Sequence, residues 1–183
     1  MIVDLPPGLV LICGAALVPL LRGRLKQAWL LLLPLVAVGV VHTVPEGSHW
    51  TFPFLGYDLV LGQVDRLARV FGYIFSLIAF IGFLFSLHVK DDLQHMAALV
   101  YAGSALGVTF AGDFFSLYVY WEFMAVASTF LILARRTPAA RAAALRYILV
   151  HLAGGLVLLA GILIRLFETD DLGVTYIGLG GPG

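Results

Sequence analysis

The sequence predicts an all-α integral membrane protein with about six transmembrane helices and a small external hairpin before the third helix. Of its 183 residues, 61% are hydrophobic and 12% are charged, and the mean hydropathy is +1.01. A soluble domain is roughly 45–50% apolar and about 25% charged. A chain of this size cannot hide the excess apolar surface in a core, so lipid is expected to cover it. The formal net charge is zero, and nothing indicates a nucleic-acid partner.

Six apolar segments support this fold class, because a transmembrane helix needs about 20 mostly apolar residues. The first two segments are short, and each carries a proline, Pro19 or Pro34, which packed membrane helices tolerate. Residues 1–183 are therefore expected to form one transmembrane domain with a tail at 168–183. The predicted helices span residues 5–21, 28–44, 67–88, 95–111, 114–134 and 142–167.

Charged loops predict the orientation. A signal peptide has positive charge before its apolar run, whereas here Asp4 precedes the first segment and basic residues follow it, so we expect a retained helix. With six helices, the two strongly basic loops fall on one side, as expected for the cytoplasmic side. Both termini are then predicted outside a cell inner membrane. The basic residues are Arg22, Arg24 and Lys26 in one loop and Arg135, Arg136 and Arg141 in the other.

The longest loop, from Pro45 to about Val64, is expected to form the external hairpin. Thr51–Phe54 and Tyr57–Leu61 have the composition of short strands around Gly56. Asp65 and Asp113 stand just before predicted helices, where an aspartate caps the first turn.

Glu122 is the main candidate site residue, because it lies near the middle of the fifth predicted helix. A carboxylate at that depth costs at least a few kcal/mol. It avoids this cost by binding a proton or by pairing with a cation, which is the chemistry of a proton relay. Tyr118 and Thr129 share its helical face. The alternative is a structural carboxyl that ties two helices together by a hydrogen bond.

His151 in the sixth segment is the second candidate, four residues after Tyr147 and just before Gly154 and Gly155. Histidine titrates near neutral pH and can pass protons. Its position close to the basic end of the helix equally fits a packing or interfacial role.

Other features predict structure rather than chemistry. Gly103 and Gly107 form a G-x-x-x-G pattern that allows close helix contact. The lone Cys13 is expected to be a small core or lipid-facing residue, and the glycines at 178–183 a flexible end. No zinc spacing, phosphate-binding loop or dinucleotide motif is present, so neither a metal nor a cofactor is expected.

The stretch Phe110-Ala-Gly-Asp-Phe-Phe-Ser-Leu-Tyr-Val-Tyr-Trp-Glu122 resembles the fifth helix of the antiporter-like membrane subunits. These are the proton-channel subunits of respiratory complex I and their relatives in Mrp-type Na+/H+ antiporters (subunits A and D) and membrane-bound hydrogenases. The pair Trp121-Glu122 is the most specific part of the match. Asp65 resembles the family's Asp-Gly before helix three, with Arg66 in place of the glycine, and Arg146–Leu149 followed by Gly154-Gly155 resembles the start of helix six.

The resemblance implies a larger protein. Family members have about fourteen helices with two inverted five-helix repeats, and their helix-five glutamate pairs with a lysine on helix seven. Glu122 matches that glutamate, but the lysine position is not in this sequence. The chain thus resembles the N-terminal part of such a subunit, either naturally split or incomplete.

The function predicted from this resemblance is a membrane subunit of a multisubunit cation/proton antiporter. Its partners would be other membrane subunits, including one that supplies the missing helices, together with protons and, in an Mrp-like complex, Na+. The chain carries no redox ligands, so any redox chemistry would lie in partners, and the chain is not expected to be an enzyme on its own. Alternatives are a proton-channel subunit of a complex I-like or membrane hydrogenase complex, or a non-transporting scaffold. A quinone-binding redox protein is disfavoured by the lack of a histidine pair at matched depth.

Overall fold

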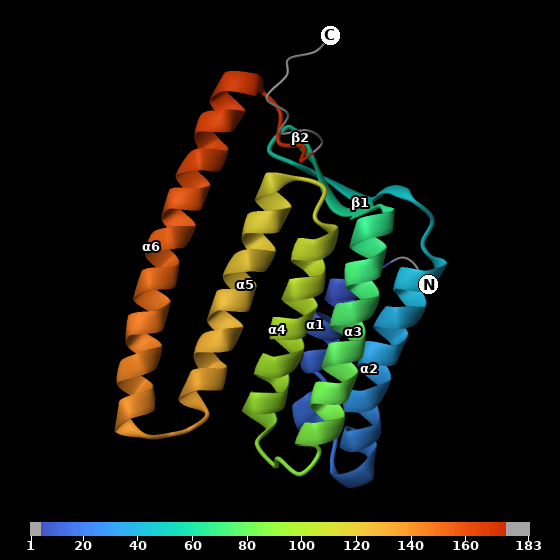
Figure 1. The fold of residues 1–183 in the computed structure, drawn as a ribbon, viewed down its shortest axis with the longest axis vertical. Coiled ribbons are helices and arrows are strands. Elements are labelled where there is room, and N and C mark those ends of the chain that lie inside the picture. The colour runs from blue at the N-terminus through green and yellow to red at the C-terminus, as the bar shows by residue number, and fades with distance from the viewer. Residues whose placement is uncertain (1–4, 175–183) are drawn as a thin grey trace.

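A computed structural model describes residues 5–174, which form six α-helices, one 3-10 turn and one two-stranded hairpin (Figure 1). The predicted fold class is confirmed, and four of the helices (α2, α3, α5 and α6) are long and apolar enough to cross a membrane. The glycine-rich end at 178–183 lies outside the described residues. The elements are α1 (Pro7–Ala15), η1 (Val18–Leu20), α2 (Gly23–Thr43), β1 (Gly47–Phe54), β2 (Tyr57–Val64), α3 (Arg66–Ser86), α4 (Asp92–Phe110), α5 (Phe114–Leu133) and α6 (Pro138–Thr169).

The first helix is shorter than predicted, because the segment at 5–21 is not one continuous span. α1 has nine residues, or about 14 Å at ~1.5 Å per residue, against a hydrocarbon core of about 30 Å. Pro19 explains the break, since its ring would meet the carbonyl of Ala15 in a continuing helix. The chain instead turns through i→i+3 hydrogen bonds, such as Leu17 N to Gly14 O at 3.3 Å.

Two other helices, α2 and α6, begin several residues earlier than predicted. α2 begins at Gly23 and α6 at Pro138, so both include basic residues assigned to loops. Thr137 caps α6 by accepting a hydrogen bond from Ala140 N, and Pro138 occupies the first helical position, where its missing N–H costs nothing.

α4 is the centre of the bundle. It packs against α1, α3, α5 and β2, while α2 packs on α3 and α6 packs on α5 at the edge (Figure 1). The predicted close contact at the glycine pair is confirmed, because a Cβ at Gly103 would overlap the carbonyl of Gly8 on α1. Cys13 is exposed on α1.

Connections between helices gather at two ends of the bundle (Figure 1). The α1–α2, α3–α4 and α5–α6 connections lie at one end, which we call the basic-loop end. The hairpin, the α4–α5 connection and the last turn of α6 lie at the other, which we call the hairpin end. The two basic loops therefore share one end, as the six-helix arrangement predicts.

The hairpin forms where the sequence predicts it, with longer strands. β1 and β2 pair antiparallel from Gly47 opposite Val64 to Phe54 opposite Tyr57. Leu55 and Gly56 make the two-residue turn, with φ of 51° and 90°, the positive values that a tight hairpin turn requires.

Asp113 fixes the hairpin to the helices. Its side chain is 1% exposed and caps α5 by accepting hydrogen bonds from Ser116 N and Oγ, each at 2.7 Å. It also accepts from Val60 N on β2 at 2.7 Å. Asp65 caps α3 by accepting from Ala68 N at 2.6 Å. Both predicted caps are confirmed, and Asp113 additionally binds a strand.

Ion pairs join the loops at the basic-loop end. Lys26 pairs with Asp92, and Arg136 donates a hydrogen bond to Asp91, which caps α4. Burial raises the pKa of the Asp91 carboxyl, but the hydrogen bonds from Arg136 and from backbone amides of α4 outweigh it and hold the pKa below its ordinary value of 3.8.

Candidate functional site

Glu122 lies near the midpoint of α5, on the face that meets α6. A Cβ at Gly155 of α6 would overlap Glu122 Oε1, so the carboxyl lies directly against the α6 backbone. A larger residue at this position would require the carboxyl to move. Oε1 is buried and has no hydrogen-bond partner among the described residues. A buried carboxyl oxygen without a donor is costly, because nothing replaces the hydration that it loses.

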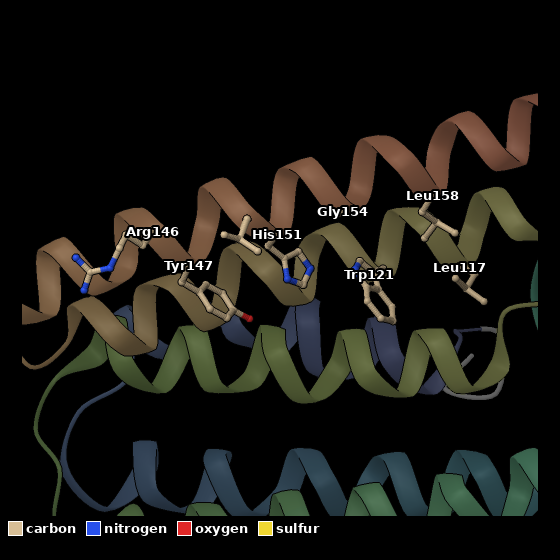
Figure 2. A pocket seen from close by; sticks show the side chains of 8 residues that line it. Leu117, Trp121, Arg146, Tyr147, His151, Gly154 and Leu158 are labelled. Carbon is tan, nitrogen blue, oxygen red and sulfur yellow. The ribbon is translucent and has the colours of Figure 1, made fainter.

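His151 lies one helical turn before Gly155 on the same face of α6. Its ring is packed between two aromatic rings, with centroids 5.9 Å from Trp121 and 5.7 Å from Tyr147. His151 Nε2 is also buried without a partner in the described part of the chain. Figure 2 shows the three rings in a row between α5 and α6.

Polar groups continue along the α5–α6 interface toward the basic-loop end. The Tyr147 hydroxyl is 2.8 Å from Ser128 Oγ, which also donates to Ala125 O. Arg146 is exposed one residue before Tyr147. Carboxyl, imidazole and hydroxyl groups thus follow one another along the interface between two membrane helices.

A pocket of about 730 Å³ opens beside this interface. It is walled mainly by apolar side chains, and His151, Tyr147 and Arg146 are its polar groups (Figure 2). Glu122 is not among the lining residues. It lies at the α5–α6 contact itself, next to Trp121, which does line the pocket.

Thr129, expected on the same face of α5 as Glu122, does not extend a hydrogen-bond chain from it. Thr129 donates its hydroxyl hydrogen bond to Ala125 O at 2.9 Å, within its own helix. The groups that lie near the interface instead are Trp121 and Ser128, with Tyr147 from α6. Helical periodicity on α5 alone could not identify these residues, because their place at the interface depends on where α6 packs against α5.

Sequence reasoning also missed Arg165, a charged residue near the end of the sixth predicted span. It lies in α6, with its guanidinium carbon 5.2 Å from the centroid of the Phe114 ring and its Nη2 3.7 Å from an Asp171 oxygen. It is therefore a stabilised cation at the hairpin end rather than a group near Glu122. The sequence did contain a sign of this residue, because Arg165 stands alone in the apolar run Ile-Leu-Ile-Arg-Leu-Phe.

The described residues include no group of three or more histidine, cysteine or acidic side chains that could hold a metal ion. Glu122 and His151 are each brought to the α5–α6 interface, with no hydrogen bond between them. Glu122 contacts Gly155, and His151 lies four residues before that glycine, so the two side chains lie about one turn of α6 apart along the interface.

Comparison with known proteins shows which membrane subunits this chain resembles. Residues 111–180 match the family described as "NADH:quinone oxidoreductase/Mrp antiporter, TM". This region contains α5 and α6, and so both candidate residues. The resemblance to the antiporter-like membrane subunits is confirmed.

Antiporter subunits are also among the similar curated sequences. Two are Na+/H+ antiporter subunit A1 proteins from Staphylococcus aureus, of strains bovine RF122 and Newman. Each is 27% identical over 144 residues, which is 74% of this chain and 18% of the relative. The chain thus spans less than a fifth of the length of these antiporter subunits.

A solved structure shares the fold. A chain of the membrane-bound sulfane sulfur reductase, described as an archaeal respiratory membrane complex, matches with a TM-score of 0.73 and 19% identity. The match covers 93% of this chain and 37% of that chain. It shows that the helices of this chain are arranged as in that chain. The similar proteins named here are subunits or chains of membrane complexes.

Proposed function

We propose that this chain is part of a membrane subunit of a multisubunit cation/proton antiporter, in which Glu122 exchanges protons at mid-membrane depth. The observation that carries the proposal is the Glu122 carboxyl, which lies against Gly155 with Oε1 buried and unpartnered among the described residues. A group held this way is poised to bind a proton or a cation.

The proposed cycle alternates between these two states. When a cationic group from a helix outside the described residues approaches, the ionised carboxylate is stabilised. When that group withdraws, the carboxyl takes up a proton. Both lysines of the chain, Lys26 and Lys90, lie at the basic-loop end, so neither supplies this cation.

His151 is proposed to pass protons between Glu122 and the basic-loop end. Its buried, unpartnered Nε2 and its neighbour Tyr147, which is hydrogen-bonded to Ser128, support this role. An imidazole can accept a proton on one nitrogen and release it from the other.

The proposed orientation follows from the charges. Since the basic loops share one end, that end is placed in the cytoplasm and the hairpin end outside the inner membrane. The coupled ion would be Na+ in an antiporter complex, whereas in a complex I-like assembly the coupling would be to electron transfer in other subunits.

Glu122→Gln tests the proposal. The chain and its partner subunits are expressed in an antiporter-deficient host, and Na+-driven proton movement is measured in everted membrane vesicles with a pH-sensitive dye. We expect Glu122→Gln to lower the exchange rate at least about tenfold, a loss of ~1.4 kcal/mol or more in transition-state stabilisation, because the amide cannot take up a proton. Glu122→Asp should retain part of the activity.

The matched control is Glu168→Gln, which removes the same charge from an exposed position at the end of α6. It should leave exchange unchanged. If Glu122→Gln assembles normally and transports at the wild-type rate, the scaffold alternative holds and the relay proposal is wrong.

A further inference from the structure

A second pocket, of about 610 Å³, lies at the basic-loop end, away from Glu122. The start of α2, the α3–α4 connection and the first turn of α4 enclose it. The charged and ionisable residues in its wall are Arg22, Lys26, His88, Lys90, Asp92 and His95.

The pocket has an excess of positive charge. Its single carboxylate, Asp92, already pairs with Lys26. Arg22 and Lys90 are exposed, and no acidic side chain in the described range 5–174 forms an ion pair with either. Three cations against one carboxylate leave two positive charges uncompensated.

The backbone adds hydrogen-bond donors to this charge. α2 begins at the pocket wall, and no side chain caps its first turn. Uncapped N–H groups at a helix start favour an anion, particularly a phosphate. The wall behind is fixed, because His95 is 2% exposed and its Nε2 is 3.0 Å from Val89 O.

The position of the pocket indicates that the anion is a lipid headgroup. It lies at the start of α2 and just past the end of α3, two helices able to cross a membrane. The ends of such helices lie at the depth of lipid headgroups. Pro19, Leu21 and Leu87 give it an apolar side suited to the glycerol backbone and upper acyl chain. Basic pockets between membrane helices on the cytoplasmic side suit anionic headgroups.

We propose that this pocket binds the phosphate of an anionic phospholipid from the leaflet at the basic-loop end. Arg22 and Lys90 contact the phosphate, Lys26 and Asp92 hold the wall together as an ion pair, and the start of α2 donates backbone hydrogen bonds. The site is separate from the proton-exchange site and does not depend on transport.

The test is lipid binding to the full chain in its complex, purified in detergent and measured by native mass spectrometry. Dioleoyl-phosphatidylglycerol is the probe, and dioleoyl-phosphatidylcholine is the zwitterionic comparison. We expect the double variant Arg22→Gln/Lys90→Gln to weaken phosphatidylglycerol binding about tenfold or more, with each cation contributing roughly fivefold. Phosphatidylcholine binding should not change.

Arg24→Gln/Arg135→Gln is the matched control, because it removes two cations from the same end but outside the pocket wall. It should leave phosphatidylglycerol binding unchanged within about twofold. A charge-retaining double variant, Arg22→Lys/Lys90→Arg, should bind like the wild type. It changes the same two side chains but keeps their charges, so it distinguishes loss of charge from loss of folding.

Equal weakening by the pocket and control variants would overturn the proposal, because the effect would then be one of general surface charge. Equal binding of the two lipids by the wild type would also overturn it. Displacement of phosphatidylglycerol by a modest excess of inorganic phosphate would identify a site for free phosphate rather than for lipid.

Discussion

At the scale of single residues, the contact between Glu122 and Gly155 is the feature that matters most. A carboxyl group rests on a glycine backbone in the middle of two membrane helices, and its Oε1 has no donor among the described residues. Ordinary packing would place a small apolar pair here. A structural carboxyl would be hydrogen-bonded, so the missing donor favours a group that changes partners.

Gly155→Ala tests this contact. The added Cβ overlaps Glu122 Oε1, so the carboxyl must move away from α6, at a cost of at most about 1 kcal/mol because it is the end of a flexible side chain. We expect lower stability in detergent unfolding and slower ion exchange than in the wild type.

Gly161→Ala is its control, because no atom lies within 4 Å of the Cβ position there. It should be neutral or stabilising by up to about 1 kcal/mol, the helix-propensity gain of alanine over glycine. Equal behaviour of the two variants would contradict the close contact.

At the scale of elements, the two ends of the bundle are held together by long-range polar contacts. At the hairpin end, Asp113 joins α5 to β2. The segment after α6 joins the start of α5, because Phe114 N donates to Leu172 O at 2.9 Å. At the basic-loop end, Arg136 and Asp91 join two connections. Such contacts fix the helix ends while the interior stays apolar.

Asp113→Ala should destabilise the chain more than a simple cap loss. It leaves the amides of Ser116 and Val60 without their acceptor, and we expect a loss of about 3 kcal/mol, against about 1 kcal/mol for Asp65→Ala. Chymotrypsin should also cut the exposed hairpin turn near Leu55 faster in Asp113→Ala than in the wild type, whereas Asp65→Ala should be cut at the wild-type rate. Equal cleavage of both variants would mean that Asp113 does not hold the hairpin.

Arg136→Gln should lower stability in a pH-dependent way. The pKa of Asp91 is held below its ordinary value of 3.8, so its ionised form contributes stability that is fully present above that value and is lost as the pH falls through the folded-state pKa. The difference between wild type and variant should be below about 1 kcal/mol at pH 7, because Arg136 is 76% exposed, and should shrink steadily as the pH falls below 3.8.

The measurement is the unfolding midpoint of each protein across this pH range. Arg135→Gln, which removes the neighbouring charge, should show no such pH-dependent difference. A difference that persists at the lowest pH would assign the effect to something other than the Asp91 carboxylate.

At the scale of the whole molecule, α6 forms one edge of the bundle (Figure 1). It packs mainly on α5, and its outer face exposes large apolar side chains such as Val150, Val157 and Phe167. Lipid or a further apolar helix can cover such a face, and the proposed function requires a further helix near Glu122. The antiporter subunits that this chain resembles are several times longer.

Local patterns in the sequence were sufficient for much of this architecture. Hydropathy gave the helical segments, and Asp65 and Asp113 gave two helix starts, because capping depends on neighbours within four residues. Two prolines had opposite effects: Pro34 lies inside α2, whereas Pro19 ends the first segment. Which outcome occurs depends on the surrounding helices and not on the local sequence.

The site was predictable only in part for the same reason. Glu122 was visible as a carboxyl in an apolar run, but Gly155, Trp121 and Ser128 belong to the site only because α6 crosses α5 at one particular height. The hydrogen bond from Val60 to Asp113 joins residues 53 apart and left no local signal.

We propose that the Glu122 carboxyl takes up and releases protons inside the membrane. The most direct measurement is the infrared difference spectrum of the complex in lipid bilayers on changing pH, since a protonated carboxyl has a carbonyl stretch that a carboxylate lacks. We expect the wild type to show a reversible carboxyl band. This band should be absent from Glu122→Gln and retained in Glu168→Gln. An identical set of bands in all three proteins would contradict it.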